Sequence, residues 1–407
     1  MAVATATTAP PKGAGGRLES IDIIRGAVMV LMAIDHARVY SGLPAGGPTA
    51  GIFFTRWVTH LCAPAFVFLA GTSAFLYGRK HQGLSRFLLT RGIWLVFLEL
   101  TFIRVAWTFN FDFAHYLLAG VIWVIGWSMI LMAALVRLPV PVVGALGVLI
   151  VAGHNLVDPF LPRIMSSLPE SGIAWLWKIL YIGFFAGPIE LGPGGPQLTV
   201  LYSIIPWAGV MAAGYGFGTI MVRDSARRRR LCLGIGLSAT ALFLIIRGFN
   251  LYGDPRPWGG AAPGAGGPPP MPALFGMLNT TKYPASFSFL LMTLGPVIAL
   301  LPALEAARGA LARGLIVFGR VPFFFYMLHI PLIHALALVV SRVRLGMVSP
   351  WLFANHPMGN PPAPDGYVWG LGLLYAVWIM AIVLLYFPCR WFAGLKAERS
   401  DPWLSYL

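Results

Sequence analysis

Charged residues are scarce in this chain. Of its 407 residues, 11% are Asp, Glu, Lys or Arg and 58% are hydrophobic, whereas soluble globular domains carry about 25% charged residues. This composition excludes the soluble globular classes. Cysteine is also rare: Cys62, Cys232 and Cys389 lie far apart, in or beside apolar runs. Their spacing predicts neither a disulfide framework nor a zinc site.

Acidic residues are the scarcer charged kind, 14 against 29 basic residues, which gives a net charge of +15. Such a charge can attract nucleic acid, but here Lys and Arg cluster between apolar runs rather than on an exposed domain. That distribution is typical of the cytoplasmic loops of membrane proteins. We therefore expect a lipid bilayer as partner, and no nucleic acid.

Long apolar runs are what the sequence has in abundance. Many are about 20 residues long, enough to cross a hydrocarbon core of about 30 Å. They predict an all-α integral membrane protein, a polytopic helical bundle of about ten transmembrane helices. The predicted spans are 21–42, 55–78, 88–110, 116–136, 140–157, 199–221, 231–250, 284–303, 320–341 and 367–389.

The basic residues also predict the orientation. When the ten spans are threaded, the Lys- and Arg-rich short connections fall on one side, which places both termini in the cytoplasm. We expect the membrane to be the inner (plasma) membrane of the cell. We expect a disordered tail over 1–16, a single transmembrane domain over 17–395 and a cytoplasmic tail over 396–407. The opposite side then carries the long connections 158–198 and 251–283, of which the second is rich in Gly and Pro and predicts a loop.

The first predicted span carries an ionisable face. At about 100° per residue, Asp22, Arg25 and His36 fall within roughly 60° of one another. Each ionisable group in a lipid-spanning helix costs roughly 2.5–3.5 kcal/mol, so such groups face a polar interior and mark function by default. Asp22 and Arg25, at i and i+3, form an internal ion pair or leave Arg25 for a ligand. The alternative for the whole face is that it only holds helices together.

Histidines supply most of the candidate catalytic groups. His36 is the favoured general base, since an imidazole with a pKa near 6.5 can take a proton from an amine or hydroxyl. Asp35 is a candidate beside it, but it points about 100° away on a regular helix and need not orient the ring. His60 in the second span and His329 in the ninth are further candidates for the same cavity. A structural hydrogen bond is the alternative for His60.

Two more polar side chains are predicted in the outer half of the bundle. Arg104 belongs to the third span, and His334 follows His329 by five residues with Pro331 between them. A proline in this position kinks the helix and changes the angle between the two rings. We assign Arg104 and His334 to substrate binding. No histidine pair has i, i+4 spacing or cysteine partners, so no metal is expected.

Several motifs of this chain resemble one family. Arg25 and His36, with ten residues between them, match the arginine–histidine pattern of the transmembrane acyltransferase superfamily. The wider pattern is similar to the heparan-alpha-glucosaminide N-acetyltransferase-like family of bacterial multi-pass membrane proteins. It comprises Arg17 to Gly26, Pro64 to Gly71, Lys282-Tyr283-Pro284, Leu290 to Pro296, Gly319 to Pro322 before His329, and Asp401 to Leu407.

The resemblance implies an acyl donor, normally acetyl-CoA, used from the cytoplasm, and a sugar or glycan acceptor on the far side. It maps the superfamily arginine onto Arg25 and the histidine onto His36. The lysosomal member of the family uses a histidine in the connection between its first two spans, and residues 41–56 contain none. That role then falls to His36 or His60.

These observations support one functional hypothesis and leave two competitors. An acyltransferase would attract acyl-CoA to a cytoplasmic basic rim that includes Arg320, with Arg25 on the path to His36, although topology alone also demands that rim. A transporter or lipid-linked carrier needs intramembrane charges too, but only Pro331 hints at a broken helix. A scaffold protein leaves the polar face unexplained. An acyl-histidine intermediate, direct transfer and a homo-oligomer all stay open.

Overall fold

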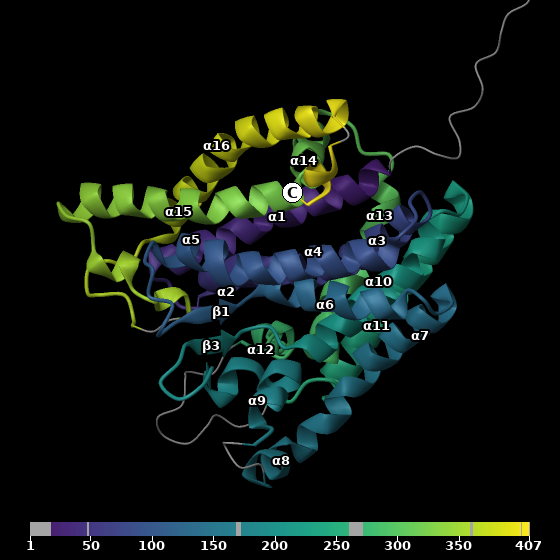
Figure 1. Ribbon diagram of the computed structural model, residues 1–407, viewed down its shortest axis with the longest axis horizontal. Coiled ribbons are helices and arrows are strands. Elements are labelled where there is room, and N and C mark those ends of the chain that lie inside the picture. The colour runs from purple at the N-terminus through teal and green to yellow at the C-terminus, as the bar shows by residue number, and fades with distance from the viewer. Residues whose placement is uncertain are drawn as a thin grey trace, which may run out of the picture.

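The computed structural model describes residues 18–46, 49–167, 172–259, 272–358, 361–399 and 401–406. The predicted disordered tail over 1–16 lies outside the described residues. Nearly all described elements are helices, and the longest of them lie side by side (Figure 1). The prediction of an all-α helical membrane bundle is confirmed.

The elements follow the chain in this order. The first half contains α1 (Glu19–Ser41), α2 (Ala50–Trp57), α3 (Cys62–Gly78), α4 (Leu84–Leu98), α5 (Arg104–Thr108), β1 (Leu117–Ala119), α6 (Val121–Leu135), α7 (Val140–Gly153), α8 (Leu161–Ser167), α9 (Ala174–Trp177), β2 (Ile189–Glu190) and β3 (Gln197–Val200). The second half contains α10 (Ile204–Met221), α11 (Ser225–Gly248), α12 (Ala273–Leu278), α13 (Phe287–Leu304), α14 (Ala310–Arg320), α15 (Pro322–Leu345) and α16 (Leu371–Glu398). A 3₁₀ turn (Val58–Leu61) joins α2 to α3, and a π-helical turn (Glu99–Ile103) joins α4 to α5.

Seven described helical segments are long and apolar enough to cross a membrane. They are Ala50–Gly78, Val140–Ser166, Ile204–Met221, Ser225–Gly248, Phe287–Leu304, Pro322–Leu345 and Leu371–Glu398. Each of the ten predicted spans contains a helix, but the count of about ten crossings is not confirmed. The 23-residue helix α1 is not among the seven; it carries the charged residues Glu19, Asp22, Arg25, Asp35 and Arg38.

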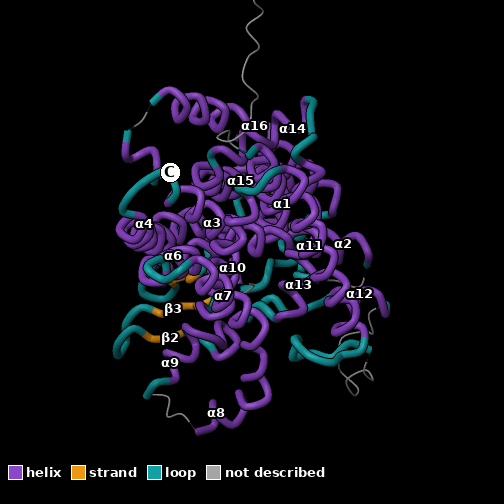
Figure 2. The backbone as a smooth tube through the Cα atoms, turned by 90° about the vertical axis from the view of Figure 1, so that its right-hand side faces the viewer, coloured by secondary structure: helices purple, strands orange, loops and turns teal. Residues whose placement is uncertain are grey.

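Helix α1 lies inside the bundle. It contacts α3, α13, α14, α15 and α16, which surround it in the view along the bundle (Figure 2). Most of its residues are buried, whereas α7, α11 and α16 present many apolar side chains outward. The ionisable face of α1 therefore meets protein rather than lipid, as the cost of an unpaired charge in hydrocarbon requires.

A small three-stranded sheet interrupts the helical architecture. Its order is β1-β3-β2, with β1 and β3 parallel and β2 and β3 antiparallel. The sequence prediction is wrong here, since residues 117–119 and 199–200 were assigned to the starts of helical spans. Short apolar runs suit a buried strand as well as a helix, so periodicity does not separate the two. The sheet brings the start of α6 close to the start of α10, beside the cavity described below.

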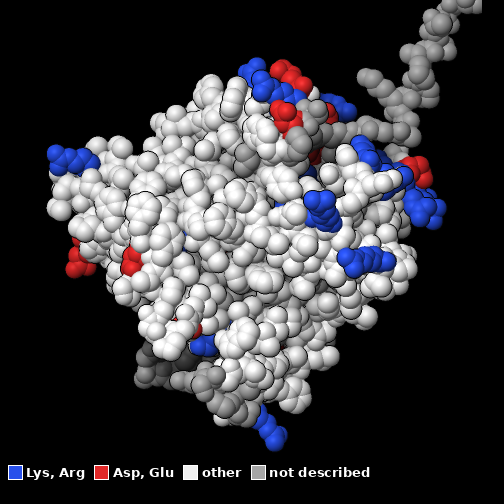
Figure 3. All heavy atoms as spheres, viewed as in Figure 1, with Lys and Arg blue, Asp and Glu red and all other residues white. Residues whose placement is uncertain are grey.

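Charge is unevenly distributed over the surface. On the face shown in Figure 3, Lys and Arg side chains gather mainly near the right-hand and upper edges, and a broad band of uncharged side chains crosses the middle. Such a band suits contact with lipid. The cytoplasmic placement of both termini and the single-domain organisation over 17–395 stay predictions.

Candidate active site

A cavity of about 650 Å³ opens beside the C-terminal half of α1. Its volume lies within the range of about 300–1,000 Å³ that is usual for small-molecule sites. It brings together three of the predicted catalytic residues, Asp35, His36 and His60. The titratable side chains in its wall, tyrosines aside, are Asp35, His36, Arg38, Arg56, His60, Glu99, Arg256, Lys282 and His356.

The fourth predicted catalytic residue, His329 of α15, contacts His36 directly. His36 Nδ1 lies 2.5 Å from His329 Nε2, and the two rings stack with centroids 4.7 Å apart. On its other side, His329 Nδ1 lies 2.7 Å from the carbonyl oxygen of Tyr326 and 3.2 Å from that of Phe325. His329 is completely buried and does not line the cavity.

This hydrogen-bond network assigns the protons of the two neutral rings. A carbonyl oxygen only accepts, so His329 Nδ1 carries a hydrogen and His329 Nε2 is the acceptor. His36 Nδ1 must then donate to His329 Nε2, which leaves His36 Nε2 with the free lone pair. The arrangement has the form of an oriented base, with the orienting residue buried behind it.

Asp35 does not orient His36. Its carboxylate accepts hydrogen bonds from Arg38 Nε at 2.8 Å and from Arg56 Nη1 at 3.0 and 3.1 Å. The first contact is local to α1, and the second ties α1 to α2. The sequence-based argument that Asp35 points away from His36 agrees with these contacts, and the partner of His36 is another histidine.

Four polar side chains of the wall have a buried atom without a hydrogen-bond partner among the described residues: Trp57, His60, Glu99 and His356. His60 is nearly buried and its Nδ1 is unpaired, while its ring meets the edge of Phe289. Glu99 Oε1 accepts the Gly120 N–H at 3.1 Å, but Glu99 Oε2 is unpaired. Buried unpaired polar atoms are costly, so those that line a cavity point to a polar occupant.

Glu99 is a candidate that the sequence analysis did not select. It begins the π-helical turn between α4 and α5, a rare conformation that occurs often at functional sites. A Cβ atom at position 120 would overlap the Glu99 carboxylate, so Gly120 permits the contact. The available signal was an acidic residue inside an apolar span, but sequence did not show that it reaches the same cavity as His36.

Aromatic side chains form much of the remaining wall. Trp107 meets the His36 ring edge-on with a centroid distance of 4.7 Å, and Tyr326 does so at 6.4 Å. The other large aromatic side chains of the wall are Phe53, Trp57, Phe184, Phe185, Tyr202, Tyr283 and Trp351. Apolar walls with a few convergent polar groups are typical of sites for small organic molecules.

Arg25 and Asp22 lie away from this cavity. Arg25 donates to the Ser73 hydroxyl and, at 3.2 Å, to the Leu69 carbonyl oxygen on α3. Its Nη1 is 4.0 Å from Asp22 Oδ1, the ion pair that was one of the two alternatives for Arg25 in the sequence analysis. His36 follows Arg25 by eleven positions, about 16 Å along the helix. The two residues of the superfamily pattern therefore occupy different levels of the bundle.

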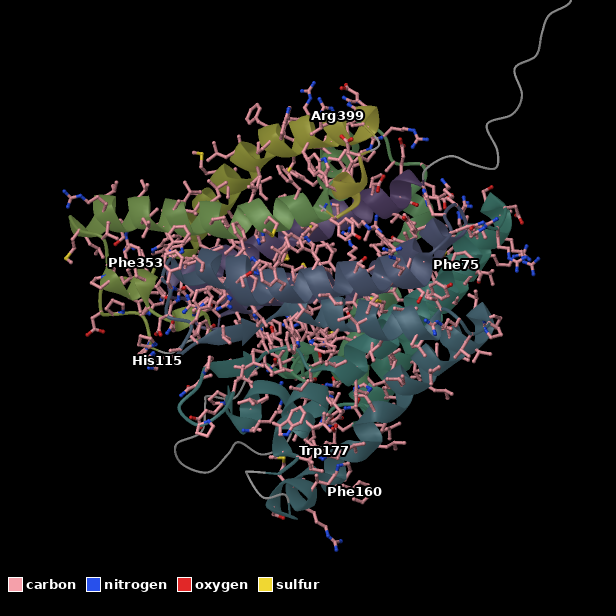
Figure 4. The ribbon with its side chains drawn as sticks, viewed as in Figure 1. Phe75, His115, Phe160, Trp177, Phe353 and Arg399 are labelled. Carbon is pink, nitrogen blue, oxygen red and sulfur yellow. The ribbon has the colours of Figure 1, made fainter. Side chains whose placement is uncertain are left out.

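Arg104 has a set of partners outside the cavity. It is fully buried and donates to the carbonyl oxygens of Asn110, Asp112 and Tyr116 at 2.5 to 2.9 Å. A longer bond of 3.3 Å reaches Asn355 Oδ1. These bonds hold two connections together at the end of the molecule where Figure 4 shows His115 and Phe353.

The last two predicted binding residues also lie outside the cavity wall. His334 is buried, stacks between Tyr40 and Phe109 with centroid distances of 4.7 and 3.8 Å, and has its Nδ1 3.2 Å from the Ala106 carbonyl oxygen. Arg320 is exposed at the end of α14. Within the described ranges, no group of three His, Cys, Asp or Glu side chains is arranged to hold a metal ion.

The fold and this site define a class: a multi-pass helical membrane protein with a histidine-containing polar cavity inside the bundle. Residues 17–252, more than half of the chain, match the catalytic domain of heparan-alpha-glucosaminide N-acetyltransferase. The chain belongs to this family and is a membrane acetyltransferase. A comparison with curated proteins gives no match. His36, His60 and Glu99 lie within the matched segment, whereas Lys282 and His329 lie beyond it.

Proposed function

We propose that the protein moves an acetyl group from acetyl-CoA to an amine or hydroxyl of a sugar or glycan. The observation that carries this proposal is the His36–His329 pair at the wall of a ligand-sized cavity, within a chain of an acetyltransferase family. His36 is the general base, and His329 positions it. His60 and Asp35 complete the catalytic side of the cavity.

Acetyl transfer requires two proton transfers, one to His36 and one from it. The acceptor nitrogen or oxygen attacks the thioester carbonyl, and His36 Nε2 takes the proton that the attacking atom loses. The carbon–sulfur bond then breaks, and the imidazolium returns the proton to the departing CoA thiolate. His329 Nε2 accepts from His36 Nδ1–H throughout, so the ring is held with Nε2 available.

The cavity suits a sugar as acceptor. A sugar ring presents hydroxyl groups around its edge and C–H groups on its faces. The unpaired atoms of His60 and Glu99 can bind the hydroxyls, while Trp57, Trp107 and Trp351 offer flat apolar surfaces. Water would fill the same space in the free protein, and the acceptor would displace it.

For the donor we propose entry from the cytoplasmic side. Arg320 belongs to the basic rim there, and Arg25 lies between that rim and His36. The Arg25 ion pair with Asp22 and its bonds to α3 hold the guanidinium part-way along α1. Arg104 and His334 lie outside the cavity, where Arg104 binds the Tyr116 carbonyl oxygen and His334 stacks on Tyr40; their proposed role is to hold these neighbouring segments in place for the acceptor.

The direct test is acetyl transfer by the purified full-length protein in detergent. Radiolabelled acetyl-CoA is supplied with glucosamine or with simple glycans, and labelled product is separated from CoA. We expect saturable, thioester-dependent labelling of the acceptor. If proteoliposomes instead take up the sugar without any thioester, and no acetylated product forms, the acetyltransferase proposal is overturned in favour of a transporter.

Removal of the positioning ring gives a second prediction. In His329→Ala, the His36 Nδ1–H loses its acceptor, so we expect kcat to fall about 100-fold with little change in KM. In His329→Gln, an amide oxygen near the former Nε2 position can accept the same hydrogen and should restore most of the activity. Equal losses in both variants would show that His329 only fills space.

A further inference from the structure

The cavity contains more positive than negative side chains. Its wall has four cations (Arg38, Arg56, Arg256 and Lys282) and two carboxylates (Asp35 and Glu99). Glu99 accepts a hydrogen bond from the Gly120 backbone N–H, so Asp35 is the carboxylate that forms ion pairs with the cations beside His36. Since Arg38 and Arg56 both bind Asp35, one negative charge is already shared between two guanidinium groups.

Lys282 adds a third cation to this group. Its side chain is 8% exposed, and its Nζ lies 5.2 Å from the ring centre of Tyr283 and 5.9 Å from that of Tyr202. Within the part of the chain that the structure describes, no carboxylate lies within ion-pair distance of Lys282. Contact with two ring faces offsets part of the cost of burying an ammonium group, but not all of it.

The loop that carries Lys282 is built to hold it at the cavity. Asp254 accepts hydrogen bonds from the backbone and hydroxyl of Thr281 at 2.7 and 2.8 Å and from the Ser286 hydroxyl at 3.0 Å. These bonds fix the residues on both sides of the lysine. The loop thus keeps a desolvated ammonium group in one place, which favours a ligand role over a solvated surface charge.

These cations also act on Tyr283, which lies in the loop before α13. Burial raises the pKa of the Tyr283 hydroxyl most strongly, but the Lys282 ammonium, the Arg56 guanidinium and a hydrogen bond with Tyr202 together lower it, so the pKa lies below its usual value of about 10. Lys282 and Arg56 also both act on the Asp35 carboxylate. The two cations therefore share one electropositive region.

Topology does not account for this charge. The positive-inside rule explains Lys and Arg in cytoplasmic connections, whereas the connection with Lys282 is predicted on the opposite side. Arg25 and the basic rim, which suit the phosphates of a CoA donor, lie toward the other end of α1. An anionic group bound at Lys282 is thus expected to belong to the acceptor rather than to the donor.

We propose that Lys282 and Arg56 form a binding subsite for an acid group of the acceptor, so that the substrate is a sugar with a carboxylate, sulfate or phosphate. The acid group lies against the ammonium and the guanidinium, while the amine or hydroxyl to be acetylated faces His36. This proposal rests on the proposed function for the identity of the acceptor, but the subsite itself is testable by binding alone.

The test compares sugars that differ only in an acid group. Glucosamine, glucosamine 6-sulfate, glucosamine 6-phosphate and muramic acid are titrated by calorimetry into the full-length protein in detergent, without acetyl-CoA. We expect at least one acidic sugar to bind about tenfold more tightly than glucosamine at low salt, and the difference to shrink as salt rises.

Variants of one lysine locate the effect. Lys282→Gln should remove the preference, so that the acidic sugar and glucosamine bind with similar affinity, whereas Lys282→Arg should keep the preference for the acidic sugar. Lys178→Gln is the matched control, because Lys178 lies outside the cavity and donates to the Pro188 carbonyl oxygen. Thermal melts of the four proteins show whether each variant is folded.

Three results would overturn the subsite proposal: equal binding of acidic and neutral sugars, a preference for the acidic sugar that survives in Lys282→Gln, or loss of CoA binding in that variant. Loss of CoA binding would assign the cations to the phosphates of the donor.

The subsite proposal and the proposed function can fail separately. If the wild type binds an acidic sugar through Lys282 but never acetylates it from acetyl-CoA, the subsite stands and the proposed acetyl transfer does not.

Discussion

His36→Ala is expected to lower the rate of acetyl transfer by about 10³-fold, within the range of roughly 10² to 10⁴ that general base catalysis contributes. The reason is geometric. His36 is the histidine that both lines the cavity and is held by His329, and removing it leaves no group in its place to take the proton of the acceptor. The measurement is the initial rate with saturating acetyl-CoA and acceptor.

A matched control separates this effect from general damage. His81 is exposed beyond α3 and stacks on Tyr77, so His81→Ala should retain the wild-type rate. Binding of CoA should survive in both variants, since the imidazole is assigned to proton transfer. If His36→Ala retained the wild-type rate, His36 would not be the general base, and His60 would be the next candidate.

Gly319→Ala is expected to destabilise the protein by about 3 kcal/mol, toward the upper part of the usual range for overpacking. A Cβ atom at position 319 of α14 would overlap the carbonyl oxygen of Asp22 on α1. That oxygen belongs to the backbone of a buried helix and has no rotamer by which to withdraw. The two helices would therefore have to move apart, because only a small residue at such a crossing lets the backbones approach so closely.

The same helix provides the control for this prediction. A Cβ atom at Gly314 would meet nothing within 4 Å, so Gly314→Ala should stabilise α14 by about 0.5–1 kcal/mol through helix propensity. Unfolding of both variants in the same detergent gives opposite shifts of Tm. A Gly319→Ala protein as stable as the wild type would mean that α1 and α14 do not approach so closely.

The α1–α14 contact also explains part of the sequence pattern. Gly26 and Gly319 both belong to the motifs by which the chain resembles its family, and each faces the backbone of the other helix. The sequence analysis placed these glycines in motifs but gave no structural reason why glycine occurs there. The cause is the close approach of two helices that lie nearly 300 residues apart in the chain.

The polar character of α1 was predictable because it depends only on local spacing. The 3.6-residue period places Asp22, Arg25 and His36 on one side, and the cost of charge in hydrocarbon turns that side inward. The Asp22–Arg25 contact followed from the same period. The orientation of Asp35 away from His36 was likewise a consequence of their adjacent positions on one helix.

The partners of these residues were not predictable, since they come from other helices. No periodicity relates His36 to His329, which is 293 residues further along the chain. The Asp35–Arg56 pair needs the chain reversal between α1 and α2, and Glu99 reaches the cavity only through a π-helical turn. The strands β1 and β3 were mistaken for helix starts because segments of three or four residues are too short to show a period of their own.

Composition and hydrophobic run length by themselves determined the membrane class, the positions of the apolar helices and the inward polar face of α1, because each follows from local solvation. Tertiary structure alone decided which polar groups meet. Packing of α15 against α1 selected His329 as the partner of His36, and the loop before α13 brought Lys282 to the cavity. Such contacts depend on how helices distant in sequence pack together, which no local pattern encodes.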